Sequence, residues 1–415
     1  MEPTHHLSSK QQLIDYFRHG IKNRNADKLG VEIEHFAVQS GSLSAVSYYG
    51  EGGVESALLQ TAGLYHEHAY SEGHLIGMRR PGVLVTLEPA GQVEVSLGEF
   101  TALAEFEREY AFFRKELDPV LQQRGQRLIN LGYHPTARVT DLPLIPKPRY
   151  RLMDAHFAAT GRYGRNMMRG TASTQVSIDY NSEKDFSKKF RLANILTPVL
   201  AWLTDNAPVF EGERAAGMVR TRIWEDLDGA RCGFAAACLD NPHFGFADYA
   251  DYILDMPPIL LIDGAGAVIP TGDKPVRALF PGEMSAHDAE HVLSMAFPHV
   301  RLKKYIEIRM ADSLPVRYAL GLVALVKGLF YNDNNLSALL HAFAAVDTAA
   351  ALSAFAALKR SGADAEVYGE PVVRLCAALL HKAREGLPAD ERGYLDALAT
   401  LITPENTARP LRLAE

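Results

Sequence analysis

Alternating apolar and polar residues mark several segments of the chain as extended strands. These segments are residues 31–38, 83–96 with a turn or bulge at 89–91, 127–131, 174–180, 220–224 and 303–309. Residues two positions apart on a strand lie on the same face of a sheet. We therefore expect the polar residues of each strand to share one face.

Helical spacing of apolar residues predicts helices between and after these strands. The expected helices cover residues 8–22, 99–124 and 182–203, and the third contains Pro198, at which it can kink. From residue 285 the pattern is helical again, apart from the strand at 303–309. Residues 336–358 and 371–401 lack strand signals and predict a helical bundle packed on the sheet.

Two segments are predicted to be irregular. Three prolines among residues 143–148 predict a loop, which leads into a basic and aromatic stretch over residues 147–169. Residues 263–266, Asp-Gly-Ala-Gly, favour a hairpin turn over a dinucleotide-binding loop, because no helical pattern follows them.

Composition narrows the function classes. The chain has 415 residues, of which 47% are hydrophobic and 22% charged, with a net charge of −7. These values argue against a disordered chain and against a general nucleic-acid binder, which would be basic. No apolar run approaches eighteen residues and the N-terminus lacks a signal-peptide pattern, so we expect no membrane partner and a cytoplasmic location. Three irregularly spaced cysteines, Cys232, Cys238 and Cys376, predict free thiols.

Five glutamates stand at even spacing on the predicted strands: Glu32, Glu34, Glu88, Glu94 and Glu307. For any one pair, the solvated face of an antiparallel sheet is an alternative explanation. However, glutamate is a poor strand former, and its repeated use beside Val, Ile and Leu needs a cause. If the strands are neighbours, the carboxylates repel one another, and a multivalent cation such as Mg²⁺ relieves that repulsion.

Positive side chains accompany these carboxylates. Arg309 follows Glu307 at the next even position, and Arg220 and Arg222 would share a face of their strand. The arginines between residues 149 and 169 either cover a solvated loop or bind an anionic substrate. His35 and His156 are interpreted as surface or packing residues.

Motifs of several common enzyme classes are absent from the sequence. There is no Gly-x-x-x-x-Gly-Lys-Ser/Thr loop, no Gly-x-Ser-x-Gly elbow and no His-Glu-x-x-His helix. P-loop nucleotidase, α/β-hydrolase and zincin functions therefore lose most of their support.

Six blocks, taken in order, resemble glutamate-cysteine ligases of the plant and proteobacterial type. They are Gly-Val-Glu-Ile-Glu-His-Phe at 30–36, Leu-Glu-Pro-Ala-Gly-Gln-Val-Glu-Val-Ser at 87–96, Arg-Tyr-Arg-Leu-Met at 149–153, and the segments at 174–180, 220–228 and 301–309. The similarity spans about residues 10 to 330. It implies an α+β fold shared with glutamine synthetase, in which an antiparallel sheet curves into a funnel with helices outside. It further implies a catalytic domain over residues 1–330 and a C-terminal helical region over 331–415 packed on it.

The resemblance also implies roles for individual residues. ATP would phosphorylate the γ-carboxylate of glutamate, and the amine of cysteine would displace the phosphate. By similarity, Glu32, Glu34, Glu88, Glu94 and Glu307 would bind Mg²⁺, and Arg309 would meet the transferred phosphoryl group. Arg220 would hold glutamate as a catalytic and binding residue, together with the other substrate-binding candidates Arg222, Trp224, Gln175, Arg149 and Tyr150. A monomer or homodimer is expected.

Two departures from the family pattern bear on the acceptor amine. His35 stands where the family often has lysine, and Cys232 stands where threonine or a small residue is usual. A ligase that joins glutamate or a related acid to a different amine is therefore one alternative. The other is a non-catalytic binder of glutamate or nucleotide, although such a protein would be expected to lose a ligand carboxylate and none of the five is missing.

Overall fold

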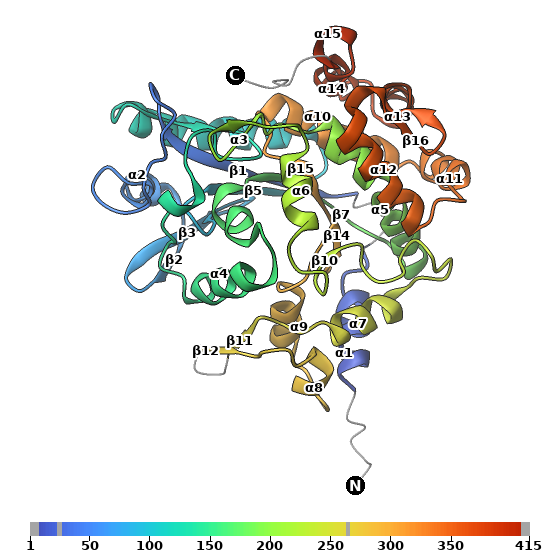
Figure 1. Cartoon of the computed structure of the whole chain (residues 1–415), viewed down its shortest axis with the longest axis horizontal. Coiled ribbons are helices and arrows are strands. Elements are labelled where there is room, and N and C mark those ends of the chain that lie inside the picture. The colour runs from blue at the N-terminus through green and yellow to red at the C-terminus, as the bar shows by residue number, and fades with distance from the viewer. Residues whose placement is uncertain (1–7, 23–26, 263–265, 408–415) are drawn as a thin grey trace.

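The computed structural model describes residues 8–22, 27–262 and 266–407. At the centre of the described chain is a nine-stranded antiparallel sheet in the order β14-β15-β7-β1-β5-β4-β3-β2, with β6 also paired to β1 (Figure 1). Its strands are β1 (Leu29–Gln39), β2 (Glu67–Ser71), β3 (His74–Arg80), β4 (Val83–Leu87), β5 (Val93–Phe100), β6 (Gln126–Ile129), β7 (Ser173–Ile178), β14 (Val300–Leu302) and β15 (Ile306–Asp312). The strands predicted at the acidic segments are therefore confirmed.

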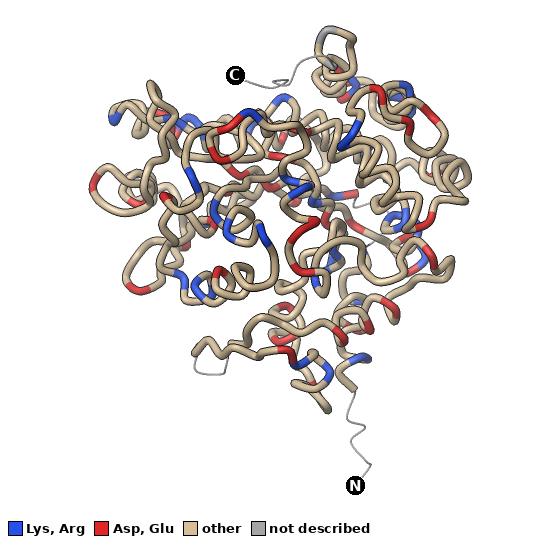
Figure 2. The backbone as a smooth tube through the Cα atoms, viewed as in Figure 1, with Lys and Arg blue, Asp and Glu red and all other residues tan. Residues whose placement is uncertain are grey.

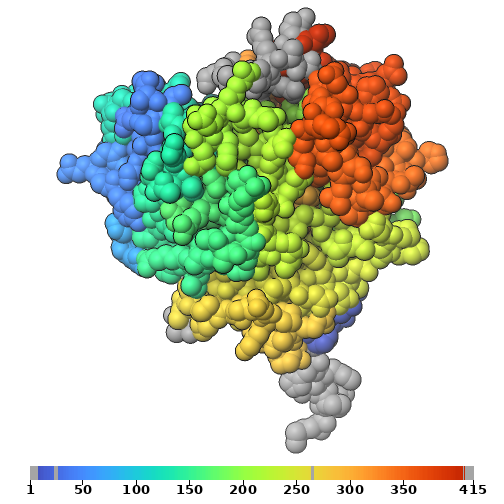
Figure 3. All heavy atoms as spheres, in the orientation of Figure 1, coloured from blue at the N-terminus to red at the C-terminus, as the bar shows by residue number. Residues whose placement is uncertain are grey.

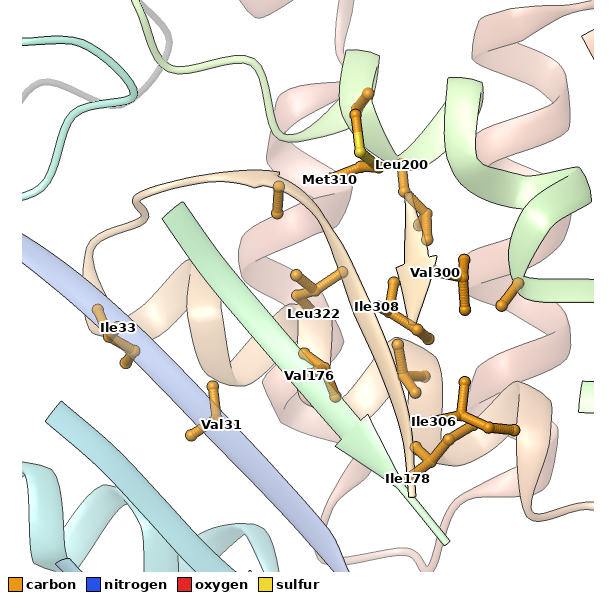
Figure 4. Packing of buried hydrophobic residues seen from close by; sticks show 14 of the residues in the cluster. Val31, Ile33, Val176, Ile178, Leu200, Val300, Ile306, Ile308, Met310 and Leu322 are labelled. Carbon is orange, nitrogen blue, oxygen red and sulfur yellow. The ribbon is translucent and has the colours of Figure 1, made fainter. Parts of the chain in front are cut away.

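Side-chain alternation gives this sheet two different faces. Val31 and Ile33 of β1, Val176 of β7 and Ile306 and Ile308 of β15 are at most 3% exposed. Figure 4 shows these apolar side chains packed together with residues of the helices behind the sheet. Because side chains alternate along a strand, the even-numbered residues of β1 and the odd-numbered residues of β15 project to the opposite, polar face.

Three long helices cover the apolar face. They are α3 (Leu103–Gln122), α5 (Glu183–Leu203) and α10 (Val316–Phe330), and they contact β5, β6, β15, β1 and β7. Ser182 caps α5 by accepting a hydrogen bond from the backbone N–H of Asp185 at 3.1 Å, and Pro198 lies inside this helix as expected. The apolar stripe predicted for the long helix after β5, including Phe106 and Tyr110, is buried.

Shorter helices lie over the polar face. They are α4 (Pro148–Thr160), a π-helical turn at Asn166–Gly170, and α6 (Val219–Glu225), which stand in front of the sheet in Figure 1. In the space-filling view of the same side, green and yellow-green atoms from these parts of the chain cover much of the sheet (Figure 3).

The strand predicted at residues 220–224 is wrong, because this segment forms α6. Met218 begins the helix from a left-handed conformation with φ 49° and ψ 42°, and its backbone N–H donates to Asp205 Oδ2 at 2.8 Å. Within the helix, the guanidinium of Arg220 lies 5.2 Å from the ring of Trp224, one turn further on. Alternation over only five residues is compatible with a strand or with a short helix. Here the hydrogen bond between Met218 and Asp205 favours the helix.

A group of smaller elements lies below the sheet in Figure 1. It contains α1 (Ser9–Arg18), α7 (Phe246–Asp255), α8 (Val276–Leu279), α9 (Ala286–Leu293) and the pair β11 (Leu260–Ile262) with β12 (Val268–Pro270). A further short pair, β10 (Cys232–Gly233) with β13 (Phe297–Pro298), is parallel. Strands β11 and β12 are antiparallel, as a hairpin turn between them requires, although residues 263–265 of that predicted turn lie outside the described residues.

After α10 the described chain is mostly helical, as the sequence predicts. The helices are α11 (Asp333–Ala342), α12 (Thr348–Ser361), α13 (Val372–Gly386), α14 (Asp396–Leu401) and α15 (Pro404–Thr407), with the small hairpin β16 (Glu366–Val367) and β17 (Glu370–Pro371). Helices α12 and α13 pack on α5 and α10. The division of the chain into domains at residue 330 stays a prediction.

The remaining elements connect these layers. They are α2 (Val54–Thr61), the hairpin β8 (Val209–Phe210) and β9 (Glu213–Arg214), and 3-10 turns at Ala62–Leu64, Val139–Asp141, Gly362–Asp364 and Arg392–Leu395. None of the described helices combines the length and apolar character that crossing a membrane demands. In the view of Figure 2, acidic and basic segments alternate over the molecule, and several of both kinds lie at its centre.

Candidate active site

The polar face of the sheet borders a cavity of about 280 Å³. Ten of the residues singled out in the sequence line it: Glu32, Glu34, Glu88, Glu94, Arg149, Tyr150, Gln175, Arg220, Trp224 and Arg309. They come from β1, the β4–β5 connection, β5, α4, β7, α6 and β15. Segments far apart in the sequence thus meet at one place because their strands are neighbours.

Strand register brings the carboxylates together. Glu34 of β1 lies directly opposite Glu94 of β5, while Glu32 lies between Ser96 on one side and Gln175 on the other. Thr86 of β4 is opposite Glu94 on its far side. Like charges directly opposite each other destabilise a sheet, so this arrangement favours a cation between them.

Hydrogen bonds fix two of the carboxylates. Glu34 accepts from the backbone N–H and the hydroxyl of Ser173, at 2.8 and 2.7 Å, and from Gln175 Nε2 at 3.4 Å. Glu94 Oε1 accepts from the hydroxyls of Thr86 at 2.7 Å and Ser96 at 3.2 Å. These neutral donors orient the carboxylates without cancelling their charge.

The carboxylates of the cavity hold their protons more tightly than ordinary glutamates do. Burial, reinforced by neighbouring carboxylates, raises the pKa of Glu32 and of Glu94 to about 8. Burial also raises the pKa of Glu34 and of Glu88, the latter helped by the charge of Glu34. Burial therefore favours the protonated form of these carboxyl groups, and a bound metal ion would favour their ionised form instead.

Glu307 differs from the other four glutamates. Its side chain is fully buried, and its carboxylate accepts from Arg301 Nε and Arg309 Nη1, both at 2.7 Å, with Lys303 Nζ at 3.4 Å. Burial alone would raise its pKa, but the three cations hold it well below the usual range. Glu307 is absent from the lining of the cavity. The structure therefore makes it a counter-ion for the arginines, although the resemblance implies a metal ligand.

The donor set fits a metal ion that shares its ligands with a substrate. Within residues 8–22, 27–262 and 266–407, no three side chains of His, Cys, Asp or Glu converge closely enough to hold one ion. Mg²⁺ is usually bound by one or two carboxylates, with phosphate oxygens and water completing its octahedral shell. The paired glutamates of the cavity match this mode better than a site made entirely of protein ligands.

Arg309 is held between β7 and a carboxylate of its own strand. Its Nη1 donates to Gln175 Oε1 at 2.6 Å and to Glu307 at 2.7 Å. The pairing of β15 with β7 is irregular between Ile308 and Ala311, which is a β-bulge at Arg309 and Met310. Bulges redirect side chains near functional sites, and this one lies at the edge of the cavity.

Three buried N–H donors of the cavity lining have no acceptor among the described residues. They are Arg149 Nε, Arg220 Nε and Trp224 Nε1. Arg220 is otherwise held by a 3.3 Å hydrogen bond from Nη2 to the carbonyl of Arg309. Buried donors without partners are costly, so an acceptor-rich ligand such as a carboxylate would satisfy them.

The start of α4 is tied to the sheet beside the cavity. Lys147 Nζ donates to the carbonyl of Leu87 at 2.7 Å, and the Tyr150 hydroxyl donates to the same carbonyl at 3.3 Å. The Leu87 carbonyl directly precedes Glu88, so the basic stretch after residue 147 is anchored next to a candidate metal ligand. Residues 148–160 of this stretch form α4, and Arg149 lines the cavity, whereas Arg151, Arg162 and Arg165 are exposed to solvent.

Arg222 does not join the other predicted site residues. Its Nε donates to the carbonyl of Gly217 at 3.0 Å, and its Nη2 donates to the carbonyl of Lys359 at 2.8 Å. The prediction that Arg220 and Arg222 share a face is wrong, because side chains two positions apart on a helix point to nearly opposite sides, whereas on a strand they share a face. Only Arg220 reaches the cavity.

Neither of the two departures from the family pattern lines the cavity, although Cys232 pairs with Phe297, which does. His35 is fully buried on the opposite face of β1, with Val93 O at 3.0 Å from Nδ1 and the Tyr110 hydroxyl at 2.8 Å from Nε2. Cys232 is buried and outside the cavity lining. The interpretation of His35 as a packing residue is confirmed. His156 is half-buried and lies 2.7 Å from Asp228 Oδ2.

Sequence reasoning missed several residues of the lining. Arg301 and Lys303 line the cavity, as do Met153, Met167 and Met168. The sequence did hold a signal for Arg301 and Lys303. They stand at even spacing from Glu307 and Arg309 in the same hairpin, so all four side chains are expected on one face of the sheet. The methionines gave no such signal, since they come from helical turns above the sheet.

A second cavity of about 550 Å³ adjoins the first. Glu32 lines both, and the second cavity is also bordered by Lys28, Arg79, Arg80 and Tyr305. Glu32 therefore stands at the boundary between the carboxylate-rich cavity and a larger cavity whose lining holds both basic residues and the acidic residues Glu67, Glu99 and Asp179.

An antiparallel sheet with helices on one face and carboxylates with arginines on the other defines a protein of the glutamine synthetase-like α+β class, which confirms the predicted fold class. The family model "Glutamate-cysteine ligase family 2(GCS2)" matches residues 28–412, and the chain belongs to this family.

Individual relatives agree with this membership. The chain is 32% identical over 341 residues to the chloroplastic glutamate-cysteine ligase of Arabidopsis thaliana, covering 80% of this chain and 65% of the relative. It is also 32% identical over 342 residues to that of Medicago truncatula, covering 80% and 66%. The chain therefore spans slightly less than two thirds of the length of these relatives.

The fold is also found among solved structures. The glutamate-cysteine ligase of Francisella tularensis, crystallised in complex with AMP, superposes with a TM-score of 0.54 at 11% identity, covering 94% of this chain and 84% of that one. At this identity the likeness concerns the fold alone.

Proposed function

We propose that the protein joins the γ-carboxylate of glutamate to the amine of cysteine while ATP is converted to ADP and phosphate. The product would be γ-glutamylcysteine, the first intermediate of glutathione synthesis. The observation that carries the proposal is the meeting of four carboxylates and four arginines in one cavity on the polar face of the sheet. Carboxylates hold Mg²⁺ against phosphates, and arginines bind carboxylate and phosphoryl oxygens.

Mg²⁺ would be held by one or two of the carboxylates Glu32, Glu34, Glu88 and Glu94 together with phosphate oxygens, since no three of them converge on one point. The ion would neutralise the charge of the ATP phosphates, and the raised pKa values of Glu32 and Glu94 support a cation in this position. Glu307 enters the proposal differently, as the group that fixes Arg309 through the 2.7 Å ion pair. Arg309 then presents its remaining N–H groups to the transferred phosphoryl group.

The larger cavity is the proposed site of the ATP nucleoside. Its volume of about 550 Å³ is in the range of small-molecule sites, and it shares Glu32 with the carboxylate chamber. The phosphates would then reach the carboxylates at that shared boundary. The AMP complex of the Francisella tularensis enzyme supports an adenine nucleotide as ligand of this fold.

Glutamate is proposed to bind in the smaller cavity. Arg220, Trp224 and Arg149 have buried donors that a carboxylate would satisfy. Gln175 and Tyr150 line the same space and would help to orient the substrate. A glutamate held this way would direct its γ-carboxylate toward the carboxylate-bound metal and the ATP phosphates.

Release of ADP tests the proposal directly. The purified protein is incubated with MgATP, glutamate and cysteine, ADP is followed by a coupled assay, and the product is identified by mass spectrometry. We expect ADP and γ-glutamylcysteine in equal amounts. Absence of ADP, or equal ADP release without any amine, would contradict the proposal. A panel of other amines tests the alternative acceptor, and preferred turnover of a non-thiol amine would support it.

The setting of the reaction is part of the same proposal. A cytoplasmic location is supported by the buried free thiols of Cys232 and Cys238, which a reducing compartment preserves. Residues 1–330 are the proposed catalytic domain, because residues from 28 to 309 supply the cavity linings. A monomer or homodimer remains the proposed assembly.

A further inference from the structure

Lys303 lies in the tight connection between β14 and β15. Arg301 pairs with Glu307 and Leu302 pairs with Ile306, so residues 303–305 form the turn, closed by a 2.8 Å hydrogen bond from Lys303 N to Tyr305 O. Lys303 lines the carboxylate cavity, whereas Tyr305 lines the larger one. The turn therefore stands at the boundary that Glu32 marks from the other side.

The ammonium group of Lys303 is less firmly held than the arginines around it. Arg309 Nη1 donates at 2.6 and 2.7 Å, and Arg301 Nε donates at 2.7 Å. In the described part of the chain, the hydrogen bonds of Lys303 Nζ are two long ones of 3.4 Å, to Glu307 Oε1 and the Tyr305 hydroxyl. The arginines are thus fixed in place, while Lys303 can turn toward a stronger acceptor.

The chemistry of lysine suits a group that moves. An ammonium ion is a compact charge on a flexible stem, with donors that rotate freely, whereas a guanidinium is a rigid planar fork. Only 23% of the Lys303 side chain is exposed, so a charge contact made there is little screened by water. The ammonium group of Lys303 can therefore keep its contact with an anionic group while that group moves between the two cavities.

We propose that Lys303 is a catalytic residue that contacts the γ-phosphoryl group of ATP while it moves to glutamate, an inference that rests on the proposed function. In that step a γ-carboxylate oxygen of glutamate forms a bond to the γ-phosphorus. The bond from this phosphorus to the β–γ bridging oxygen breaks, and its electron pair leaves with ADP. Lys303 gives no proton and forms no covalent bond. It stabilises the negative charge of the phosphoryl oxygens.

The neighbouring residue supplies a matched control. Lys304 belongs to the same turn but faces outward, with 43% of its side chain exposed, a 3.3 Å ion pair to Glu290 and a contact over the ring of Tyr16. Replacement of either lysine by glutamine removes one positive charge from the same turn. Any difference between the two variants therefore reports on the cavity and not on net charge.

The experiment compares wild type with Lys303→Gln, Lys303→Arg and Lys304→Gln in glutamate-dependent ADP release. We expect Lys303→Gln to lower kcat by roughly a hundredfold or more, the usual effect of losing one transition-state contact, with KM for cysteine changed less than about threefold. Lys303→Arg should recover part of the rate, and Lys304→Gln should stay within about threefold of wild type. Circular dichroism and thermal unfolding verify that each variant is folded.

The outcomes separate this inference from the proposed function. Wild-type protein that makes no γ-glutamyl product would overturn both. Active wild type together with a Lys303→Gln variant of near-normal kcat would overturn the role of Lys303 alone. If Lys303→Gln does not fold, the kcat of the folded Lys303→Arg variant tests the role of Lys303. Full wild-type kcat in this variant would contradict the need for a mobile ammonium group, because a guanidinium is rigid.

Discussion

Glu34 of β1 and Glu94 of β5 face each other directly across the antiparallel register of the sheet. Both lie on the polar face, and burial together with neighbouring carboxylates raises the pKa of Glu94 to about 8. Without a cation, ionisation of both carboxylates would be repulsive, so Glu94 keeps its proton up to about pH 8, whereas a bound cation would let both carboxylates ionise. The same two residues therefore link the protonation of the ligand-free protein to cation binding at the proposed site.

Glu94→Gln tests this relationship, because it removes one charge and keeps the side-chain volume. At pH 9, where Glu94 is mostly ionised although burial raises its pKa to about 8, we expect the ligand-free variant to be as stable as wild type or more stable by about 0.5–1 kcal/mol, since a like-charge cross-strand pair is removed. We also expect a smaller rise in thermal midpoint on adding MgATP. Thermal unfolding with and without MgATP measures both. Glu366→Gln, an exposed change on β16, should alter neither.

Glu307→Gln is expected to have the opposite effect on stability. Glu307 is fully buried between Arg301, Arg309 and Lys303, so removal of its charge leaves buried cations without a partner. Breaking a buried ion pair in this way costs about 3–5 kcal/mol. Urea unfolding of the ligand-free variant measures the loss. Unchanged stability with loss of Mg²⁺ dependence alone would instead make Glu307 a metal ligand.

The sequence predicted the strands of the site because their pattern is local. In β1, the side chains of Val31, Glu32, Ile33 and Glu34 alternate between the two faces, and this period of two is visible without any tertiary information. The even-numbered glutamates were therefore assigned correctly to one face. Neighbouring strands then had only to pair in register for the carboxylates to meet.

Other features of the site depend on contacts that the sequence does not display. The segment at 220–224 alternates like a strand, yet the hydrogen bond from Met218 N to Asp205 starts a helix and separates Arg222 from Arg220. Glu307 has the same alternation as Glu32, but three cations surround it. Whether a strand carboxylate faces a cavity or an ion pair is decided by its neighbours on other strands.

Arg220 and Arg222 form a second matched pair for mutation. Arg220→Gln removes a buried cation of the cavity, so we expect kcat/KM for glutamate to fall by roughly a hundredfold, equivalent to about 3 kcal/mol. Arg222→Gln removes contacts to the carbonyls of Gly217 and Lys359 and should leave KM for glutamate within about threefold of wild type. Steady-state kinetics with varied glutamate measures both. Equal losses in the two variants would contradict the assignment of Arg220 alone to the cavity.

His134 makes the stability of the protein depend on pH. Its Nδ1 accepts hydrogen bonds from the backbone N–H groups of Thr136 at 3.3 Å and Ala137 at 3.0 Å, and burial lowers its pKa from 6.5 to about 4. At a pH between these two pKa values, His134 is protonated in the unfolded chain but neutral in the folded protein. Stability from this residue is therefore complete above pH 6.5 and is lost as pH falls, by about 1 kcal/mol at pH 5.5.

His134→Asn isolates this contribution, because an asparagine oxygen can accept from the same N–H groups without titrating. Urea unfolding at pH 7.5 and pH 5.5 gives the change in free energy for each protein. The variant loses the ring contact with Phe36, so its stability at pH 7.5 should be lower than that of wild type. Its further loss on moving to pH 5.5 should nevertheless be smaller by about 1 kcal/mol, because the other buried histidines titrate equally in both proteins. Identical losses in the two proteins would show that His134 is protonated in the folded state at pH 5.5.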